Sequence, residues 1–577
     1  MTRRILSLTF LVLGLFGTQL QAQTSKKKKP NATPPPVVET VQPQQVDDII
    51  EEELVPVPLH DQGFHTPSIN LDPYAGLIQA YQAPSPKRIV NGVGVYPKLK
   101  DTAQWNGRQA GTYSLQFKIR GLQQGDEVYL ADHHIGGKYL RDTAWVDKKG
   151  WAVFTGTERL QRGMYLFVLP QKQGYFEFVV DDDQEFSIET DTAFYTGEYY
   201  PNMVVSGSEE NLRFLNYQKG KTAVIEKLIA VDEQMKNDTL PEQKKALEEK
   251  RRALLMEKED FDLNYIRQNP NSLLARFLYS MVDVPYPEHF PIDPITGLAD
   301  SSLPYTWYKA HYWDHIDFGE DGLVRMPVNI MKQKMDFFFD KIILPDPDSC
   351  IQVCEFLLNK TAGSVEMEKY MTWYLTNRFE SSNIMGQDKV FVYLALNTYC
   401  RGKAWWADSN TISKMCENAY RRAHTVIGQL APPLELQDKN ENWVNTASVK
   451  APWTIMIFWD PTCGHCKEVM PKLAKIYNDN KDKGWKVIAL SSGDKRSEWI
   501  DYMKAHPEMD GFIHLIRDKV QSEFMKQNLY AYYVIASPTI YVLDSNRKVV
   551  ANRIDVEKIE EFIGHLEAIE KAKTKAE

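Results

Sequence analysis

Apolar and polar residues alternate along the chain between Tyr113 and about Asp191. The clearest stretch is 113–119, which reads Tyr-Ser-Leu-Gln-Phe-Lys-Ile. Further short apolar runs follow at 127–130, 144–146, 151–154, 164–169 and 175–180. A period of two, interrupted by glycine-containing turns, is typical of short half-buried strands. We therefore predict an antiparallel β-sandwich or β-barrel domain over residues 113–195.

The pattern changes to helical features between residues 206 and 424. Ser206-Gly207-Ser208-Glu209 resembles a capping box, which marks the start of a helix. Residues 242–259 carry opposite charges at i,i+4 spacing, as in a solvated helix or an arm of an antiparallel hairpin. We predict that 206–424 form an all-α domain.

A third pattern begins near residue 425. Apolar runs of strand length at 453–459, 486–491, 512–516 and 540–544 are separated by stretches that include apolar residues at helical spacing. Strands alternating with helices imply a central sheet that is covered on both faces. We predict an α/β domain over 425–577, and hence a multidomain chain that is β-rich first, all-α in the middle and α/β at the end.

Length and composition agree with this division. A chain of 577 residues is expected to form several domains, and a hydrophobic content of 43% is ample for their cores. The net charge of −9 is mild for this length and carries no basic signal for nucleic acid. We therefore expect no nucleic-acid partner.

The first 112 residues contain no clear element pattern. Arg3 and Arg4 precede an apolar run over 5–16, so residues 1–22 read as a signal peptide. The run is shorter than the roughly 20 residues that span a bilayer, although an uncleaved anchor stays open as an alternative. Lysine, proline and acidic runs make 23–58 a disordered linker, and 59–112 is an uncertain connecting segment. We expect an exported protein with no stable transmembrane span after signal cleavage.

The candidate chemistry is the pair Cys463 and Cys466, separated by Gly464 and His465. The pair lies where the apolar run 453–459 gives way to a helical stretch. A helix N-terminus stabilises a thiolate, the attacking species in disulfide exchange, and a second thiol one turn along can resolve the mixed disulfide. Half of a zinc site and a purely structural disulfide are the alternatives. The zinc site would need another pair of ligands, which this part of the chain lacks. A structural disulfide across so short a loop would add little stability, because it removes little chain entropy.

The same region resembles the thioredoxin superfamily. The resemblance rests on Trp459, the cysteine pair, Pro471 and Ser537-Pro538-Thr539 ahead of a strand, and it covers about residues 425–577. The lead-in over 427–436 is similar to that of the TlpA/ResA branch of envelope thiol–disulfide oxidoreductases. The resemblance implies that Cys463 is the nucleophile, Cys466 the resolving thiol and Pro538 a cis-proline, with Trp459 and Pro538 shaping the surface that meets the substrate.

Two positions depart from that family pattern. Ile457 stands where many thioredoxins carry a buried acid, and Val469 where ResA-like proteins carry a glutamate. The proton acceptor for Cys466 is therefore an open question. Cationic His465 in the first helical turn would favour the Cys463 thiolate, so with Gly464 it is a candidate for tuning the redox potential. We expect a potential nearer about −200 mV than −270 mV.

The expected function is that of an exported thiol–disulfide oxidoreductase in the periplasm of a Gram-negative envelope. Its partners would be protein thiols or disulfides and an unidentified electron donor. No cofactor is expected, because the cysteine pair itself carries two electrons. Two alternatives stay open. One is a thiol peroxidase, although Pro461-Thr462-Cys463 is too compressed for the peroxiredoxin pattern. The other is a binding or scaffold protein in which residues 113–424 do the work, since both upstream regions resemble domains of unknown function.

The remaining cysteines and two histidine pairs are weaker candidates. Cys350, Cys354, Cys400 and Cys416 are interpreted as ordinary helix thiols, with a structural disulfide among them left open. His133 and His134 are adjacent on a strand and so point to opposite faces. His311 and His315 share a helix face but lack the glutamate of a protease zinc helix. We expect no metal site.

Overall fold

The computed structural model describes residues 110–191, 202–237, 241–284, 302–493, 495–517 and 529–576. The expected signal peptide (1–22), linker (23–58) and nearly all of the connecting segment (59–112) lie outside these residues. In the part of the chain that is described, no helix has the length and apolar character needed to cross a membrane.

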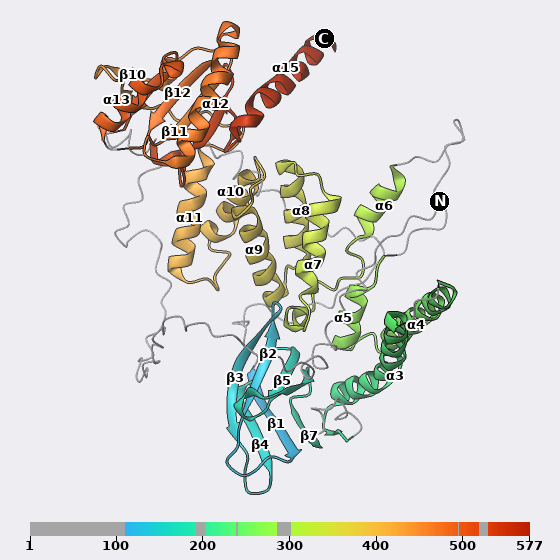
Figure 1. Cartoon of the computed structure of the whole chain (residues 1–577). Coiled ribbons are helices and arrows are strands. Elements are labelled where there is room, and N and C mark those ends of the chain that lie inside the picture. The colour runs from blue at the N-terminus through green and yellow to red at the C-terminus, as the bar shows by residue number, and fades with distance from the viewer. Residues whose placement is uncertain are drawn as a thin grey trace, which may run out of the picture. The chain divides into compact units, whose positions relative to one another are not determined.

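The first folded region is a β-sandwich of two four-stranded sheets, ordered β4-β1-β7-β8 and β3-β2-β5-β6 (Figure 1). Its strands are β1 Ala110–Arg120, β2 Glu127–His134, β3 Gly137–Trp145, β4 Trp151–Glu158, β5 Gly163–Val168, β6 Tyr175–Val180, β7 Glu185–Asp191 and β8 Val204–Ser206. Leu115, Phe117 and Ile119 of β1 are buried while Gln116 between them is exposed, which is the alternation seen in the sequence. The predicted β domain is confirmed, with one difference: β1 pairs with β7 in parallel.

Two long charged helices follow, α3 Glu209–Asn237 and α4 Pro241–Gln268. Lys221 pairs with Asp262 at 3.0 Å, and Arg251 pairs with Asp232 at 2.7 Å. Lys221 and Asp232 of α3 thus pair with Asp262 and Arg251 of α4, so the partners on α4 come earlier in the chain as those on α3 come later. This order identifies an antiparallel hairpin. The predicted hairpin arm is therefore confirmed, and a small apolar strip that includes Leu228 and Leu254 lies between the helices.

The rest of the middle region is also helical, as predicted. Its helices are α5 Leu273–Met281, α6 Leu303–His311, α7 Ile330–Phe337, α8 Pro347–Lys360, α9 Val365–Glu380, α10 Asp388–Asn397 and α11 Ser409–Ala423. Cys400, just after α10, forms a disulfide with Cys416 of α11, whereas Cys350 and Cys354 are buried free thiols.

The C-terminal region is built on a seven-stranded sheet ordered β10-β9-β13-β12-β11-β14-β15. Its strands are β9 Glu435–Gln437, β10 Trp443–Asn445, β11 Thr454–Trp459, β12 Lys486–Ser491, β13 Ile513–Ile516, β14 Thr539–Leu543 and β15 Val549–Asn552. Its helices are α12 Gly464–Asn480, α13 Arg496–Ala505 and α15 Ile559–Ala576. The strand β11 pairs in parallel with β12 and antiparallel with β14.

All six residues of β11 are buried because the sheet is covered on both faces. Ile455, Ile457 and Trp459 pack into one core cluster, together with residues of α12, α13 and α15. Met456 and Phe458 point to the other face and pack into a second cluster. The continuous apolar run in the sequence is thus explained by a central strand with two buried faces. Its C-terminal end positions the cysteine pair.

Candidate redox site

The Cys463–Cys466 pair lies at the junction of β11 and α12. A turn follows β11, in which the Asp460 carboxylate accepts hydrogen bonds from the Thr462 backbone N–H at 2.7 Å and from its hydroxyl at 2.5 Å. Cys463 is the N-cap residue of α12, and its sulfur accepts a hydrogen bond from the Cys466 backbone N–H at 3.4 Å. Unpaired N–H groups and the helix dipole favour negative charge at this position. The arrangement can therefore stabilise a thiolate at Cys463.

The two thiols differ in their exposure. Cys463 is half-buried, whereas Cys466 is completely buried at 0% exposure. Burial raises the pKa of Cys466 to about 12; the Asp460 backbone N–H, 3.5 Å from its sulfur, opposes this shift, and the neighbouring Cys463 thiol adds to it. A partner can reach Cys463, while Cys466 is protected and held as a thiol.

The loop before β14 faces Cys463. The Ser537–Pro538 peptide bond is cis, as the family resemblance implied. The Cys463 thiol donates a hydrogen bond to the Ser537 carbonyl oxygen at 3.5 Å. Ser492, the residue after β12, donates from its hydroxyl to the Trp459 carbonyl oxygen at 3.0 Å and lies 3.4 Å from the Ser537 hydroxyl. Residues from three separate stretches of sequence thus meet around the cis-proline loop.

The surroundings of Cys466 are apolar where the sequence departs from the family pattern. Ile457 and Val469 are both buried in the same core cluster as Cys466. The charges of Cys463 and Asp460 raise the pKa of Cys466, and Cys466 in turn raises the pKa of Tyr502. Tyr502 was not anticipated from the sequence, because it reaches the site from α13.

Trp459 requires a correction. Its side chain is 0% exposed, and its ring lies 5.1 Å from that of Tyr502 in the core. A fully buried ring has no surface with which to contact a partner, so the expectation that Trp459 contacts substrate is wrong. It supports the end of β11 from beneath instead.

His465 is exposed, with 68% of its side chain accessible. Its Nδ1 atom lies 3.6 Å from the Glu468 carboxylate, on the outer side of α12. Solvent and this nearby anion both screen a charge on the imidazole, so a contribution of His465 to thiolate stability is expected to be small. Gly464 has open space where a Cβ would stand, so the fold does not require glycine there.

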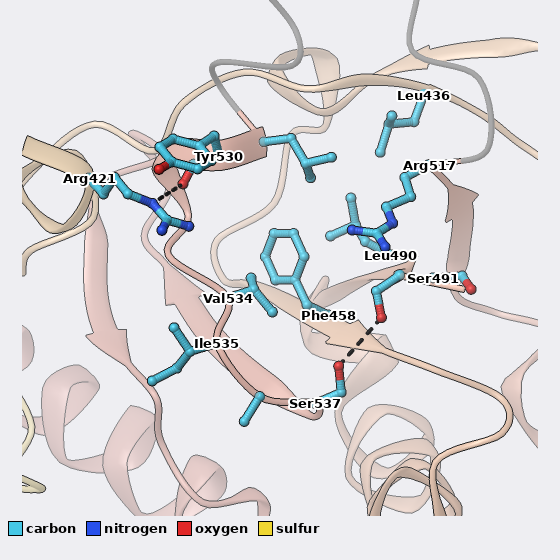
Figure 2. A pocket seen from close by; sticks show the side chains of 13 residues that line it. Arg421, Leu436, Phe458, Leu490, Ser491, Arg517, Tyr530, Val534, Ile535 and Ser537 are labelled. Carbon is cyan, nitrogen blue, oxygen red and sulfur yellow. Dashed lines mark hydrogen bonds between the residues drawn. The ribbon is translucent and has the colours of Figure 1, made fainter. Parts of the chain in front are cut away.

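A groove of about 430 Å³ adjoins the cis-proline loop (Figure 2). Its apolar lining includes Phe458, Leu490 and Ile535, while Arg421 and Arg517 are its two cationic residues. Arg421 belongs to α11, outside the predicted domain 425–577. No pattern in the sequence signalled that this residue lies near Ser537.

Three of the four other candidate histidines have hydrogen-bond partners, while the buried Nδ1 atom of His134 has none among the described residues. His133 shares a 2.8 Å hydrogen bond with Glu177. His311 hydrogen-bonds to the Asp314 carboxylate at 2.6 Å, and His315 hydrogen-bonds to the Val282 carbonyl oxygen at 3.0 Å. The two histidines therefore have separate hydrogen-bond partners. Among the described residues, no group of three or more His, Cys, Asp or Glu side chains is arranged to hold a metal ion.

Comparison with known proteins agrees with this geometry. Residues 453–549 match a family model described as thioredoxin-like, and residues 278–418 match a domain of unknown function, DUF5106. The thiol–disulfide oxidoreductase ResA of Bacillus subtilis (strain 168) is 26% identical over 123 residues, which are 21% of this chain and 64% of that protein. The ResA of a Bacillus cereus strain is 24% identical over 143 residues, which are 25% of this chain and 78% of that protein.

A solved structure is also similar. A domain of a possible thiol-disulfide isomerase from Cytophaga hutchinsonii ATCC 33406 is 31% identical, with a TM-score of 0.24, over 26% of this chain and 97% of that one. The chain spans just under two thirds of the length of the Bacillus subtilis relative. The matched family model and the two ResA relatives place the C-terminal domain of this chain among the thioredoxin-like proteins, with ResA-type thiol–disulfide oxidoreductases as homologues.

Proposed function

We propose that this chain exchanges disulfides with partner proteins through Cys463 and Cys466. One observation carries the proposal. The accessible Cys463 thiol caps α12 and faces the Ser537 carbonyl of the cis-proline loop, while the buried Cys466 thiol lies one helical turn further along. The curated relatives are named as thiol–disulfide oxidoreductases, which is the same chemistry.

The reaction proceeds in two exchanges. The Cys463 thiolate attacks one sulfur of a partner disulfide, forming a mixed disulfide and releasing the partner's other sulfur as a thiolate, which takes up a proton. Cys466 then loses its proton and attacks the Cys463 sulfur. This releases the second partner thiol and leaves a Cys463–Cys466 disulfide, so two electrons pass to the partner. A dithiol electron donor restores the pair by the reverse steps.

The compartment belongs to the same proposal. The apolar run near the N-terminus favours export, and the Cys400–Cys416 disulfide is the kind of bond that persists in an oxidising compartment. We place the mature protein in the periplasm, beginning near Gln23. The intact mass of the protein recovered from the envelope tests this placement, and a full-length cytosolic product would contradict it.

Trapping tests the exchange itself. Full-length protein with Cys466→Ser should hold partners as mixed disulfides on Cys463, because the resolving thiol is gone. Protein with Cys463→Ser is the matched control and should hold none. Adducts that form equally on both variants, or on neither, would refute the proposal. The adducts also identify the partners.

A further inference from the structure

Helix α11 contacts the segment that leads into the cis-proline loop. The Arg421 guanidinium lies 3.6 Å from the centre of the Tyr530 ring, and its Nε donates to the Tyr530 carbonyl oxygen at 3.5 Å. Figure 2 shows Arg421 beside Tyr530, with Ser537 at the other end of the same stretch. The Tyr530 hydroxyl donates to the Glu417 carboxylate, also on α11. The tyrosine is therefore held at its ring, its hydroxyl and its backbone.

The next residue of α11 holds a second tyrosine. Arg422 is 6% exposed and donates to the Tyr533 hydroxyl at 3.0 Å and to the Glu380 carbonyl oxygen at 2.9 Å. Its guanidinium lies 4.5 Å from the centre of the Tyr533 ring and 4.7 Å from the centre of the Phe391 ring. A charged group buried in this way keeps its geometry only while its partners stay in place.

The backbone at Tyr533 has a conformation of the kind that such contacts enforce. Tyr533 has φ of 45°, in the left-handed region that a bulky side chain rarely adopts. Such a conformation persists when surrounding contacts enforce it. At Tyr533 these contacts are the hydrogen bonds of its hydroxyl with Arg422 and Asn418. Tyr533 lies shortly before Ser537, whose carbonyl oxygen receives the hydrogen bond of the Cys463 thiol.

A second set of contacts joins the helical region to the C-terminal domain. Asp388, at the start of α10, accepts a hydrogen bond from Asn552 of β15 at 2.6 Å and lies 3.4 Å from the Arg553 guanidinium. Asp388 and Asn552 are both buried. The helical region thus contacts the C-terminal domain at β15 as well as at the cis-proline loop.

We propose that Arg421 and Arg422 of α11 are positioning residues for thiol–disulfide exchange, holding the Tyr530–Tyr533 segment so that the cis-proline loop presents its backbone correctly beside Cys463. The inference rests on the proposed function and extends it to the helical region, which thereby forms part of the redox site. A partner protein must dock its chain against this loop, whereas a small disulfide needs only the Cys463 sulfur. The two kinds of substrate therefore respond differently to a displaced loop.

The experiment measures the rate at which the reduced full-length protein reduces insulin, divided by the rate at which it reduces a small aromatic disulfide. Arg421→Gln, Arg422→Met and Tyr533→Phe should each lower this ratio by roughly five-fold, because each removes contacts to the loop. Tyr533→Phe removes one hydroxyl and keeps the ring, so it tests the same contact without disturbing the α11 packing. Arg422→Lys should recover part of the ratio.

Lys414→Gln is the matched control, because Lys414 is an exposed cation on α11 and should keep the wild-type ratio. An unchanged ratio in all three loop variants would overturn the inference. So would a parallel loss of both rates, which would mean that the arginines only stabilise the fold. If the wild-type protein reduces neither substrate, the proposed function itself fails and the inference fails with it.

Discussion

The Cys463 thiol lies 3.5 Å from the carbonyl oxygen of Ser537, a residue 74 positions further along the chain. The contact joins the N-terminus of α12 to the loop before β14. It forms because β11 and β14 are neighbours in the sheet, with Phe458 opposite Thr539. Cys463 is thereby placed at an accessible edge of the domain, while Cys466 is enclosed behind it.

Alkylation should distinguish the cysteines by their exposure. We expect Cys463 of the reduced protein to react with iodoacetamide near neutral pH at least roughly a hundred-fold faster than Cys466, Cys350 or Cys354, which are all buried. Mass spectrometry of the digested protein measures each site. In denaturant the four sites should react at similar rates, and faster native labelling of Cys466 would contradict the assigned roles.

Resolution of the mixed disulfide should accelerate with pH. The pKa of Cys466 is raised to about 12 by burial, so the folded protein holds it as a thiol and its thiolate fraction grows as pH rises toward that value. We expect the release of a trapped partner to speed up by roughly ten-fold per pH unit between about pH 7 and 9. The Cys463 thiol contributes to this raised pKa, and that contribution is lost once Cys463 is in a mixed disulfide. The release rate should therefore stop rising at a pH below about 12. Stopped-flow measurement of release, with Cys466→Ser as the control, checks this; a rate independent of pH would contradict it.

The charge near the helix N-terminus should tune the redox potential slightly. The protonated form of His465 favours the thiolate and so the reduced pair, and His465→Gln removes that form, so the potential should become more negative. Glu468→Gln removes the anion 3.6 Å from the imidazole and should shift the potential the other way. Because both side chains are exposed, each shift should be no more than about 20 mV. Equilibration against a glutathione series measures both, and shifts in the same direction would disprove the electrostatic explanation.

The Cys400–Cys416 disulfide should stabilise the helical region. It closes a loop with a sequence separation of 16 and ties α11 to the turn after α10. Cys400→Ser should lower the free energy of unfolding by about 2 to 4 kcal/mol, through a less restricted unfolded chain. Urea titration followed by tryptophan fluorescence measures this change. Wild-type protein reduced at Cys400–Cys416 should show the same loss, and an unchanged midpoint in both would show that the bond does not carry stability.

Local pattern by itself determined the order and type of the three regions. Alternation in 113–119 marked β1 correctly because only one side of that strand is buried, and the long apolar run at 453–459 marked a central strand because β11 is buried on both sides. The cysteine pair was also found from local context, since a strand followed by a helix places the first cysteine at a helix N-terminus. These features depend on neighbours within a few residues, which a sequence displays directly.

Contacts between distant segments were decided only by the tertiary structure. The family resemblance implied that Trp459 contacts the substrate, yet the side chain at this last position of β11 points into the core. The parallel pairing of β1 with β7 and the choice of Cys416 as partner for Cys400 depend on how remote segments pack. The contacts of Arg421 and Arg422 with Tyr530 and Tyr533 span more than a hundred residues. The physical reason is that hydrophobic periodicity records which side of an element is buried, but not which distant element buries it.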